Sequence, residues 1–325
     1  MCALHFQCSG RRASPKIKVV PLTLPNPPAT DHIAPADRGY LDPPGTVEPV
    51  HGLFHAPAPV RFWHLASLDA PTVAAVWSLA FAWIVRARLP LWVLALQVLV
   101  VWTVYVGDRL LDARAGLRRW TPKLPNELRE RHFFHWRFRR ILAPLALVSA
   151  CAAACIALHW MPVGARERDS VLAAASLAYF TRVHAGSLRA RSIVSKELLV
   201  GVLFTAGCAL PAWSRGDWRA LVVPVLLFAA LAWLNCRAIE RWETGQQGIA
   251  RAARWTTCGG IIAAAGMAFA EPRAAALLAA GACSALLLAW LDRLRERMAP
   301  VTLRAAADLV LLTPALLLAF WAVGR

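Results

Sequence analysis

The chain has 325 residues, of which 58% are hydrophobic and 17% are charged. An average soluble domain is about 45–50% apolar and about 25% charged, so this composition excludes a disordered protein and argues against a soluble globule. The net charge of +17 would indicate nucleic-acid binding in a soluble protein. Here long apolar runs separate the basic residues, which excludes a soluble DNA-binding role.

Residues 1–60 differ in composition from the rest of the chain. They hold 11 of the 22 prolines, including the tandem pairs Pro27-Pro28 and Pro43-Pro44, and they show no helical period. We expect residues 1–60 to form a disordered or loosely extended tail and residues 61–325 to form one transmembrane helical domain. The tail lacks the apolar core of a signal peptide, so no secretory cleavage is expected.

After residue 70 the chain alternates between apolar runs and short connections rich in arginine. Most runs have about 17–20 residues, the length that crosses roughly 30 Å of hydrocarbon. The sequence therefore predicts an all-α, multi-pass membrane protein with about nine transmembrane helices, within a range of eight to ten. The first, fourth and seventh runs are short or polar at one end. The expected spans are 71–86, 89–108, 141–161, 169–185, 194–213, 218–236, 255–271, 273–291 and 305–323.

The basic residues alternate from one connection to the next. The connections 112–140, 182–196, 237–254 and 292–304 carry 21 Lys and Arg, whereas the four alternate connections carry seven. Because positive charge is retained on the cytoplasmic side, we expect the N-terminus and these four connections to be cytoplasmic, facing an inner membrane if the protein is bacterial. Contact with anionic membrane lipids then explains most of the basic charge.

The cysteines and a histidine pair have simple structural interpretations. Cys151 and Cys155 are one helical turn apart without a nearby histidine or acid, so we expect them to pack as small apolar residues. His132 and His135 lie in the stretch HFFHWRF, which is typical of an interfacial amphipathic helix.

Two carboxylates close the second run, in the stretch VWTVYVGDRLLDARAG. Asp108 and Asp112 are four residues apart and project from one face of a helix, on the same stripe as Tyr105. Mg²⁺ binds to one or two carboxylates together with substrate phosphates, so these aspartates are candidate Mg²⁺ ligands. The alternative is ion pairing with Arg109, Arg114 or an arginine of a neighbouring helix.

Polar residues also close the sixth run, and a basic cluster follows the fourth. Glu240 and Glu243 share a helix face, and Asn235 adds an amide oxygen; the alternative is an ion network with neighbouring arginines. Such acids at span ends must face a cavity or a partner. The basic cluster contains Arg182, Arg189, Arg191 and Lys196. Guanidinium and ammonium groups bind diphosphate oxygens, although these residues also fit the charge bias of the connections.

Together these three places suggest a metal–diphosphate site at the mouth of an apolar bundle. The stretches Asp108-x3-Asp112 and Asn235 to Glu243, with the connection from Tyr179 to Lys196, resemble the UbiA superfamily of intramembrane prenyltransferases. That family has nine helices, with Asp-rich motifs after the second and the sixth. The resemblance covers roughly residues 70–323. This sequence departs from the usual first motif at Val104 and Tyr105, and its second motif has fewer acids.

The resemblance implies a Mg²⁺-dependent enzyme that transfers a prenyl group from a polyprenyl diphosphate to a lipophilic or aromatic acceptor. Two alternatives stay open: a non-catalytic relative that binds an isoprenoid or quinone-like lipid, and a transporter, for which Gly201, Gly207 and Pro211 hint at a helix break. The implied roles are Mg²⁺ binding by Asp108 and Asp112, a second metal site at Glu240 and Glu243 with Asn235, diphosphate binding by Arg182 and Lys196, and pocket lining near the reactive carbon by Tyr105 and Tyr179.

Overall fold

A computed structural model describes residues 54–119, 130–184, 195–246 and 248–323. Most of the predicted tail lies outside these ranges. The described residues form α-helices and a short 3₁₀ helix, and no extended strand occurs among them. The α-helices are α1 (Ala58–Leu65), α2 (Asp69–Ile84), α3 (Leu91–Arg119), α4 (Glu130–Arg137), α5 (Arg139–Trp160), α6 (Val163–His184), α7 (Lys196–Trp213), α8 (Arg219–Thr244), α9 (Ala250–Met267), α10 (Pro272–Leu294), α11 (Pro300–Val310) and α12 (Thr313–Val323).

Within the described ranges, five helices are long and apolar enough to cross a membrane, namely α3, α5, α7, α8 and α10. Two bent pairs, α1 with α2 and α11 with α12, raise this number to seven when each counts as one span. The prediction of a helical, multi-pass membrane protein is therefore supported by length and composition. Each of the nine expected spans overlaps a helix or a bent pair, but α6 and α9 are not apolar enough to count as membrane-crossing helices. The α6 helix is continuous but carries four charged residues at 166–169, and α9 is rich in Gly, Thr and Ala.

Many apolar side chains of the helices are exposed on the outside of the bundle, which would be unfavourable in water. Only 11% of the apolar window of α3 is buried inside the protein. Large apolar side chains such as Leu147, Val171, Ile262 and Leu316 are exposed on α5, α6, α9 and α12. Continuous exposed apolar area on this scale is typical of a surface that lipid covers.

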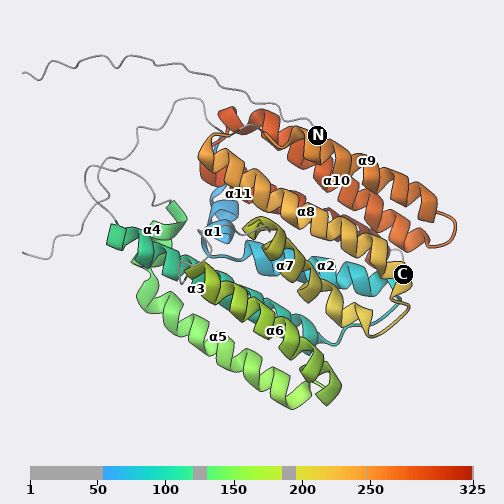
Figure 1. Cartoon of the computed structure of the whole chain (residues 1–325), viewed down its shortest axis with the longest axis horizontal. Coiled ribbons are helices and arrows are strands. Elements are labelled where there is room, and N and C mark those ends of the chain that lie inside the picture. The colour runs from blue at the N-terminus through green and yellow to red at the C-terminus, as the bar shows by residue number, and fades with distance from the viewer. Residues whose placement is uncertain (1–53, 120–129, 185–194, 247, 324–325) are drawn as a thin grey trace, which may run out of the picture. The chain divides into compact units, whose positions relative to one another are not determined.

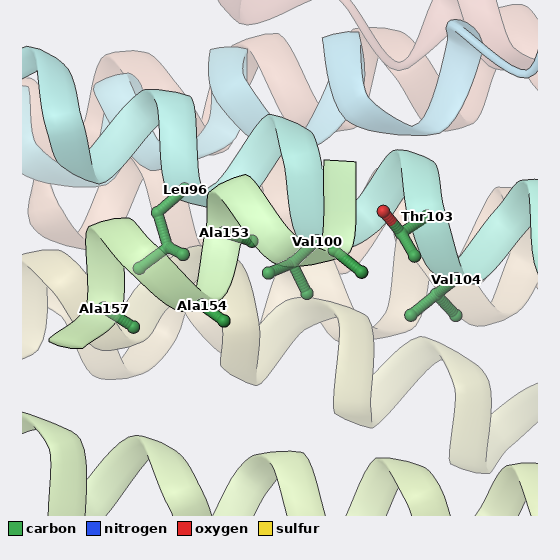
Figure 2. A pocket seen from close by; sticks show the side chains of 8 residues that line it. Leu96, Val100, Thr103, Val104, Ala153, Ala154 and Ala157 are labelled. Carbon is green, nitrogen blue, oxygen red and sulfur yellow. The ribbon is translucent and has the colours of Figure 1, made fainter. Parts of the chain in front are cut away.

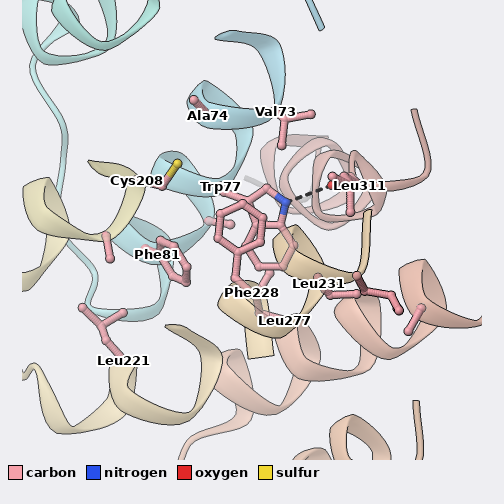
Figure 3. Packing of buried hydrophobic residues seen from close by; sticks show 14 of the residues in the cluster. Val73, Ala74, Trp77, Phe81, Cys208, Leu221, Phe228, Leu231, Leu277 and Leu311 are labelled. Carbon is pink, nitrogen blue, oxygen red and sulfur yellow. Dashed lines mark hydrogen bonds between the residues drawn. The ribbon is translucent and has the colours of Figure 1, made fainter. Parts of the chain in front are cut away.

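The interior is built around α2, which packs against α3, α7, α8 and the C-terminal helices. Trp77 and Phe81 of α2 meet Phe228 of α8 in a fully buried aromatic cluster (Figure 3). The rings of Trp77 and Phe228 are stacked with centroids 3.9 Å apart. The Trp77 indole N–H donates to the Leu311 carbonyl across 2.9 Å, where α11 ends. This cluster ties α2, α8 and the α11–α12 bend together.

Several helix ends that carry the candidate residues lie close together at one end of the bundle. Successive long helices run in opposite directions, so the C-terminal ends of α3 and α8 lie near the N-terminus of α11, with α1 and α4 beside them (Figure 1). Close crossing of α7 and α8 requires Gly201, because a side-chain carbon there would lie 2.9 Å from the Trp233 amide nitrogen. The chain before α1 joins this end too, since the Ala56 N–H donates to Thr302 Oγ1. Folded structure therefore begins within the segment that the sequence assigns to the tail.

Candidate functional site

A sharp corner between α1 and α2 starts the site. The two helices meet at 88°, and Ser67 in the turn has a φ of 60°, in the left-handed region that costs energy for a residue other than glycine. Two side chains of α3 hold the corner: the Trp102 indole N–H donates to the Ala66 carbonyl across 3.0 Å, and the Arg109 guanidinium donates to the His64 carbonyl across 2.9 Å. The corner places His64, at the end of α1, against Asp69, at the start of α2.

Five side chains from five helices meet there, and we call them the His64 cluster: His64, Asp69, Arg109, Asn235 and Asp308. His64 Nδ1 lies 2.7 Å from Asp69 Oδ2 and 3.5 Å from Asp308 Oδ2. An Arg109 nitrogen lies 3.4 Å from Asp69 Oδ2. The Asn235 amide donates to Asp308 Oδ1 across 3.0 Å. All five side chains are buried except that of Asp308, which is 16% exposed.

Buried charges of this kind are retained at a cost, because removing an ion from water is unfavourable unless partners replace the water. In the His64 cluster one guanidinium and one imidazole face two carboxylates. Buried ionisable groups within an apolar bundle are a strong indication of a functional site. The sequence analysis identified only Asn235 among these five as a candidate. The sequence feature that could have pointed to this cluster is Asp308, because it is an acid inside the apolar run 305–323.

The predicted α3 residues lie beside the His64 cluster. Tyr105 is within electrostatic range of Asp69, Asp308 and Arg109. Asp108 and Asp112 are half-buried one and two turns further along α3. Both carboxylates are within electrostatic range of Tyr179 on α6. The structure therefore brings four of the predicted residues, Tyr105, Asp108, Asp112 and Tyr179, into one region, and the donor type of the two aspartates fits Mg²⁺.

The two glutamates predicted for a second metal have ion-pair partners. Glu240 accepts from Arg237 at 2.6 Å, one of the ion pairs that the sequence left open as an alternative. Glu243 pairs with Arg304 of α11, with Arg131 of α4 3.9 Å away. The Glu240 pair lies within α8, whereas the contacts of Glu243 join α8 to α11 and α4.

The predicted diphosphate binders lie at the surface. Arg182 at the end of α6 and Lys196 at the start of α7 are both exposed. Lys196 Nζ lies 3.7 Å from Glu197 Oε1 of the same turn. Arg189 and Arg191 fall outside the described residues. The α7 helix runs unbroken from Lys196 to Trp213, so Gly201 and Gly207 do not interrupt it.

An apolar groove of about 330 Å³ runs along α3 and α5 (Figure 2). Its lining is aliphatic apart from Thr103. Val104 lines the groove and precedes Asp108 by one helical turn, so an apolar chain in the groove would end near that carboxylate. The lining residues are Leu96, Val100, Thr103, Val104, Ala150, Ala153, Ala154 and Ala157.

The α4 helix buries both histidines of the HFFHWRF stretch. His135 Nδ1 lies 2.8 Å from the Arg131 carbonyl, and Nε2 lies 3.1 Å from the Ser67 hydroxyl. Since a carbonyl accepts only, Nδ1 carries the ring proton and Nε2 accepts from Ser67. His135 thus braces the corner that positions His64. Burial lowers the pKa of His135 to about 4, and the charges of Arg109 and Arg131 act in the same direction.

We expect His135 to make stability fall in acid. Its folded-state pKa lies below the ordinary value of 6.5, so the unfolded chain takes up the proton first and stability falls as pH drops from about 6.5 to about 4. Unfolding in detergent, compared between wild type and His135→Gln, should show the wild-type advantage shrinking by about 3 kcal/mol over this window. His159→Gln, at an exposed position in α5, should show no such pH dependence. A pH-independent difference for His135→Gln would contradict this assignment.

No family model, curated protein or solved structure matches this chain.

Proposed function

We propose that this protein is a UbiA-like intramembrane prenyltransferase, which moves a prenyl group from a polyprenyl diphosphate to a lipophilic or aromatic acceptor. The observation that supports the proposal is the position of Tyr105, Asp108 and Asp112 along α3 beside the His64 cluster, at one end of an apolar helical bundle. Tyr179 of α6 is within electrostatic range of both aspartates. An amphiphilic substrate with a charged head and a long hydrocarbon tail matches this division between polar and apolar surface.

The groove along α3 and α5 supports the part of the proposal that concerns binding of the prenyl tail. Its aliphatic lining suits an isoprenoid chain, which within a bilayer would be held by van der Waals packing rather than by removal from water. Val104 borders the groove and Asp108 follows one turn later. A tail lying along α3 therefore directs its diphosphate toward the two aspartates.

The chemistry requires charge neutralisation. Breaking the allylic carbon–oxygen bond leaves a diphosphate anion and an allylic cation; the acceptor then forms the new carbon bond and loses a proton. Asp108 and Asp112 would hold Mg²⁺, which when bound offsets the charge of the leaving diphosphate. Arg182 at the end of α6 and Lys196 at the start of α7 would bind its outer oxygens. Tyr105 and Tyr179 would face the cation.

The proposal is tested by binding of a radiolabelled polyprenyl diphosphate to the full-length protein in detergent, with Mg²⁺ or with EDTA. We expect Mg²⁺-dependent binding that falls at least tenfold in Asp108→Asn/Asp112→Asn. The matched control is Asp217→Asn, an exposed aspartate between α7 and α8. Metal-independent binding, or equal binding by the double variant, would overturn the catalytic proposal.

A second candidate is a non-catalytic protein of the same architecture that binds an isoprenoid or quinone-like lipid. The observation that favours it is the pairing of Glu240 with Arg237 and of Glu243 with Arg304, which engages the carboxylates expected to hold a second metal. This candidate predicts binding of the prenyl alcohol as tightly as the diphosphate and no need for Mg²⁺. The same binding assay, run with both ligands, distinguishes the two functions.

A further inference from the structure

The His64 cluster contains a set of metal-ligand atoms that the proposed transfer reaction does not use. His64 Nδ1, Asp69 Oδ2 and Asp308 Oδ2 all lie within 4.8 Å of one another. The two distances from Nδ1 are 2.7 and 3.5 Å. Zinc–nitrogen and zinc–oxygen bonds are about 2.1 Å long, so ligand atoms of one ion lie roughly 3 to 4 Å apart. The 3.5 Å distance falls in this range, whereas the 2.7 Å distance is that of a direct ion pair and must lengthen by a few tenths of an ångström when a cation enters.

The two carboxylates are oriented by partners outside this triangle. Asp69 Oδ1 accepts from the Ala70 N–H at 2.9 Å, and Asp308 Oδ1 accepts from the Asn235 amide at 3.0 Å. Each aspartate therefore has one oxygen held by a neighbour and the other directed at His64. Hydrogen bonds to the outer oxygen are the usual way in which a protein orients carboxylate ligands toward a metal.

Three buried polar atoms of the cluster make no hydrogen bond among the described residues. His64 Nε2 makes no hydrogen bond there, and the His64 side chain is only 2% exposed. His64 Nδ1 also lacks an aligned hydrogen bond despite its short distances to the carboxylates. Asn235 Oδ1 is unpartnered as well, although the nitrogen of the same amide contacts Asp308 and the residue is 7% exposed. Of these atoms, His64 Nδ1 and Asn235 Oδ1 are the ones that a ligand within the cluster could satisfy. His64 Nε2 lies on the other side of the imidazole ring and would carry the ring proton.

From this geometry we propose that His64, Asp69 and Asp308 form a binding site for a divalent first-row transition metal, with Asn235 Oδ1 as a fourth oxygen donor. The imidazole nitrogen decides the class of metal, because imidazole suits Zn²⁺, Fe²⁺ and similar ions whereas Mg²⁺ prefers oxygen ligands alone. The site joins α1, α2, α8 and α11. It is distinct from the Asp108 and Asp112 carboxylates and does not rest on the proposed transferase activity.

Arg109 limits the affinity of this site. Its guanidinium lies 3.4 Å from Asp69 Oδ2, one of the proposed ligand atoms. A bound dication and this guanidinium repel each other, so a metal must displace the Arg109–Asp69 contact while the bond from Arg109 to the His64 carbonyl persists. The site is thus expected to bind a metal reversibly rather than to hold it permanently.

The test uses full-length protein in detergent, stripped with EDTA after removal of any affinity tag, and Mn²⁺ followed by electron paramagnetic resonance. We expect one equivalent of bound Mn²⁺ that a tenfold excess of Mg²⁺ does not displace and that Zn²⁺ does. The bound Mn²⁺ should show hyperfine coupling to a nitrogen nucleus, which reports directly on imidazole ligation in the wild-type protein.

Variants locate the site. His64→Gln should lose the nitrogen coupling, and Asp308→Asn should weaken Mn²⁺ binding at least tenfold. Asp292→Asn is the matched control, because Asp292 is also a buried aspartate and accepts from the Trp242 indole at 2.8 Å, away from His64. It should bind Mn²⁺ normally.

Three outcomes would overturn the proposal: less than one equivalent of Mn²⁺ in the wild type, bound Mn²⁺ without nitrogen coupling, or full binding in His64→Gln. The variant Asp108→Asn/Asp112→Asn keeps this site and loses the proposed diphosphate site. Failure of the metal proposal is therefore distinguishable from failure of the proposed function.

Discussion

Replacing Arg109 with methionine should lower the free energy of unfolding by about 3–5 kcal/mol. The guanidinium is buried, donates to the His64 carbonyl and lies against Asp69. Methionine fills similar volume but leaves the Asp69 carboxylate in an apolar interior without its arginine. Removing one partner of a buried ion pair has a cost of this size because the remaining charge stays desolvated.

The measurement is unfolding in mixed micelles followed by tryptophan fluorescence. Arg114→Met is the matched control, since Arg114 is exposed on the same helix and its replacement should change the free energy by less than about 0.5 kcal/mol. Adding Asp69→Asn to Arg109→Met should recover part of the loss, because the second change removes the orphaned charge. Equal stability of Arg109→Met and Arg114→Met would show that the cluster is not a buried ion network.

Replacing Trp77 with alanine should also be severe, with a loss of about 3–5 kcal/mol. Trp77 is fully buried, stacks on Phe228 and donates to the Leu311 carbonyl (Figure 3). Alanine leaves a cavity where α2, α8 and α11 meet, and the buried Leu311 carbonyl loses the hydrogen bond from the indole N–H. Because Leu311 follows Asp308 by less than one turn, the change should also weaken Mn²⁺ binding at the His64 cluster.

Unfolding and Mn²⁺ binding measured on the same samples check this prediction. Trp77→Phe retains a ring for Phe228 and loses only the indole donor, so it should cost about 1–3 kcal/mol. Trp255→Ala serves as the control, because Trp255 is exposed on the outer face of α9. A Trp77→Ala protein as stable as Trp255→Ala would contradict the packing described for the core.

The helical class of the protein could be predicted from the sequence because the signal is local. A run of apolar residues long enough to span hydrocarbon must satisfy its own backbone hydrogen bonds, and a helix does this within the run. The nine expected runs overlap helices for this reason, although five of the described helices, or seven with the bent pairs, are long and apolar enough to cross a membrane. The stretch HFFHWRF predicted the helix at α4, whereas α1 was not predicted, and contacts with distant segments position both. His135 of α4, for example, bonds Ser67 in the α1–α2 turn.

In the candidate site too, relations between residues near in sequence could be predicted, whereas contacts between distant helices could not. Tyr105, Asp108 and Asp112 could be placed on one helical stripe from their spacing, because helix geometry depends only on positions within α3. The ion pair of Glu240 with Arg237 could also be predicted from sequence, because the two residues are three apart on one helix. The pairing of Glu243 with Arg304 could not, since Arg304 belongs to the last bent pair of helices.

The sequence by itself indicated a helical chain with several runs long and apolar enough to span a membrane, and it placed Asp108, Asp112, Glu240 and Glu243 near the ends of such runs. Only the tertiary structure decided that His64, Asp69 and Asp308 share one site, since no spacing rule connects the corner before α2 with the last helices. The physical reason is the difference in range. Hydrophobicity and helical periodicity act between near neighbours in the chain, whereas a buried polar cluster forms only when packing brings distant helices together and excludes water.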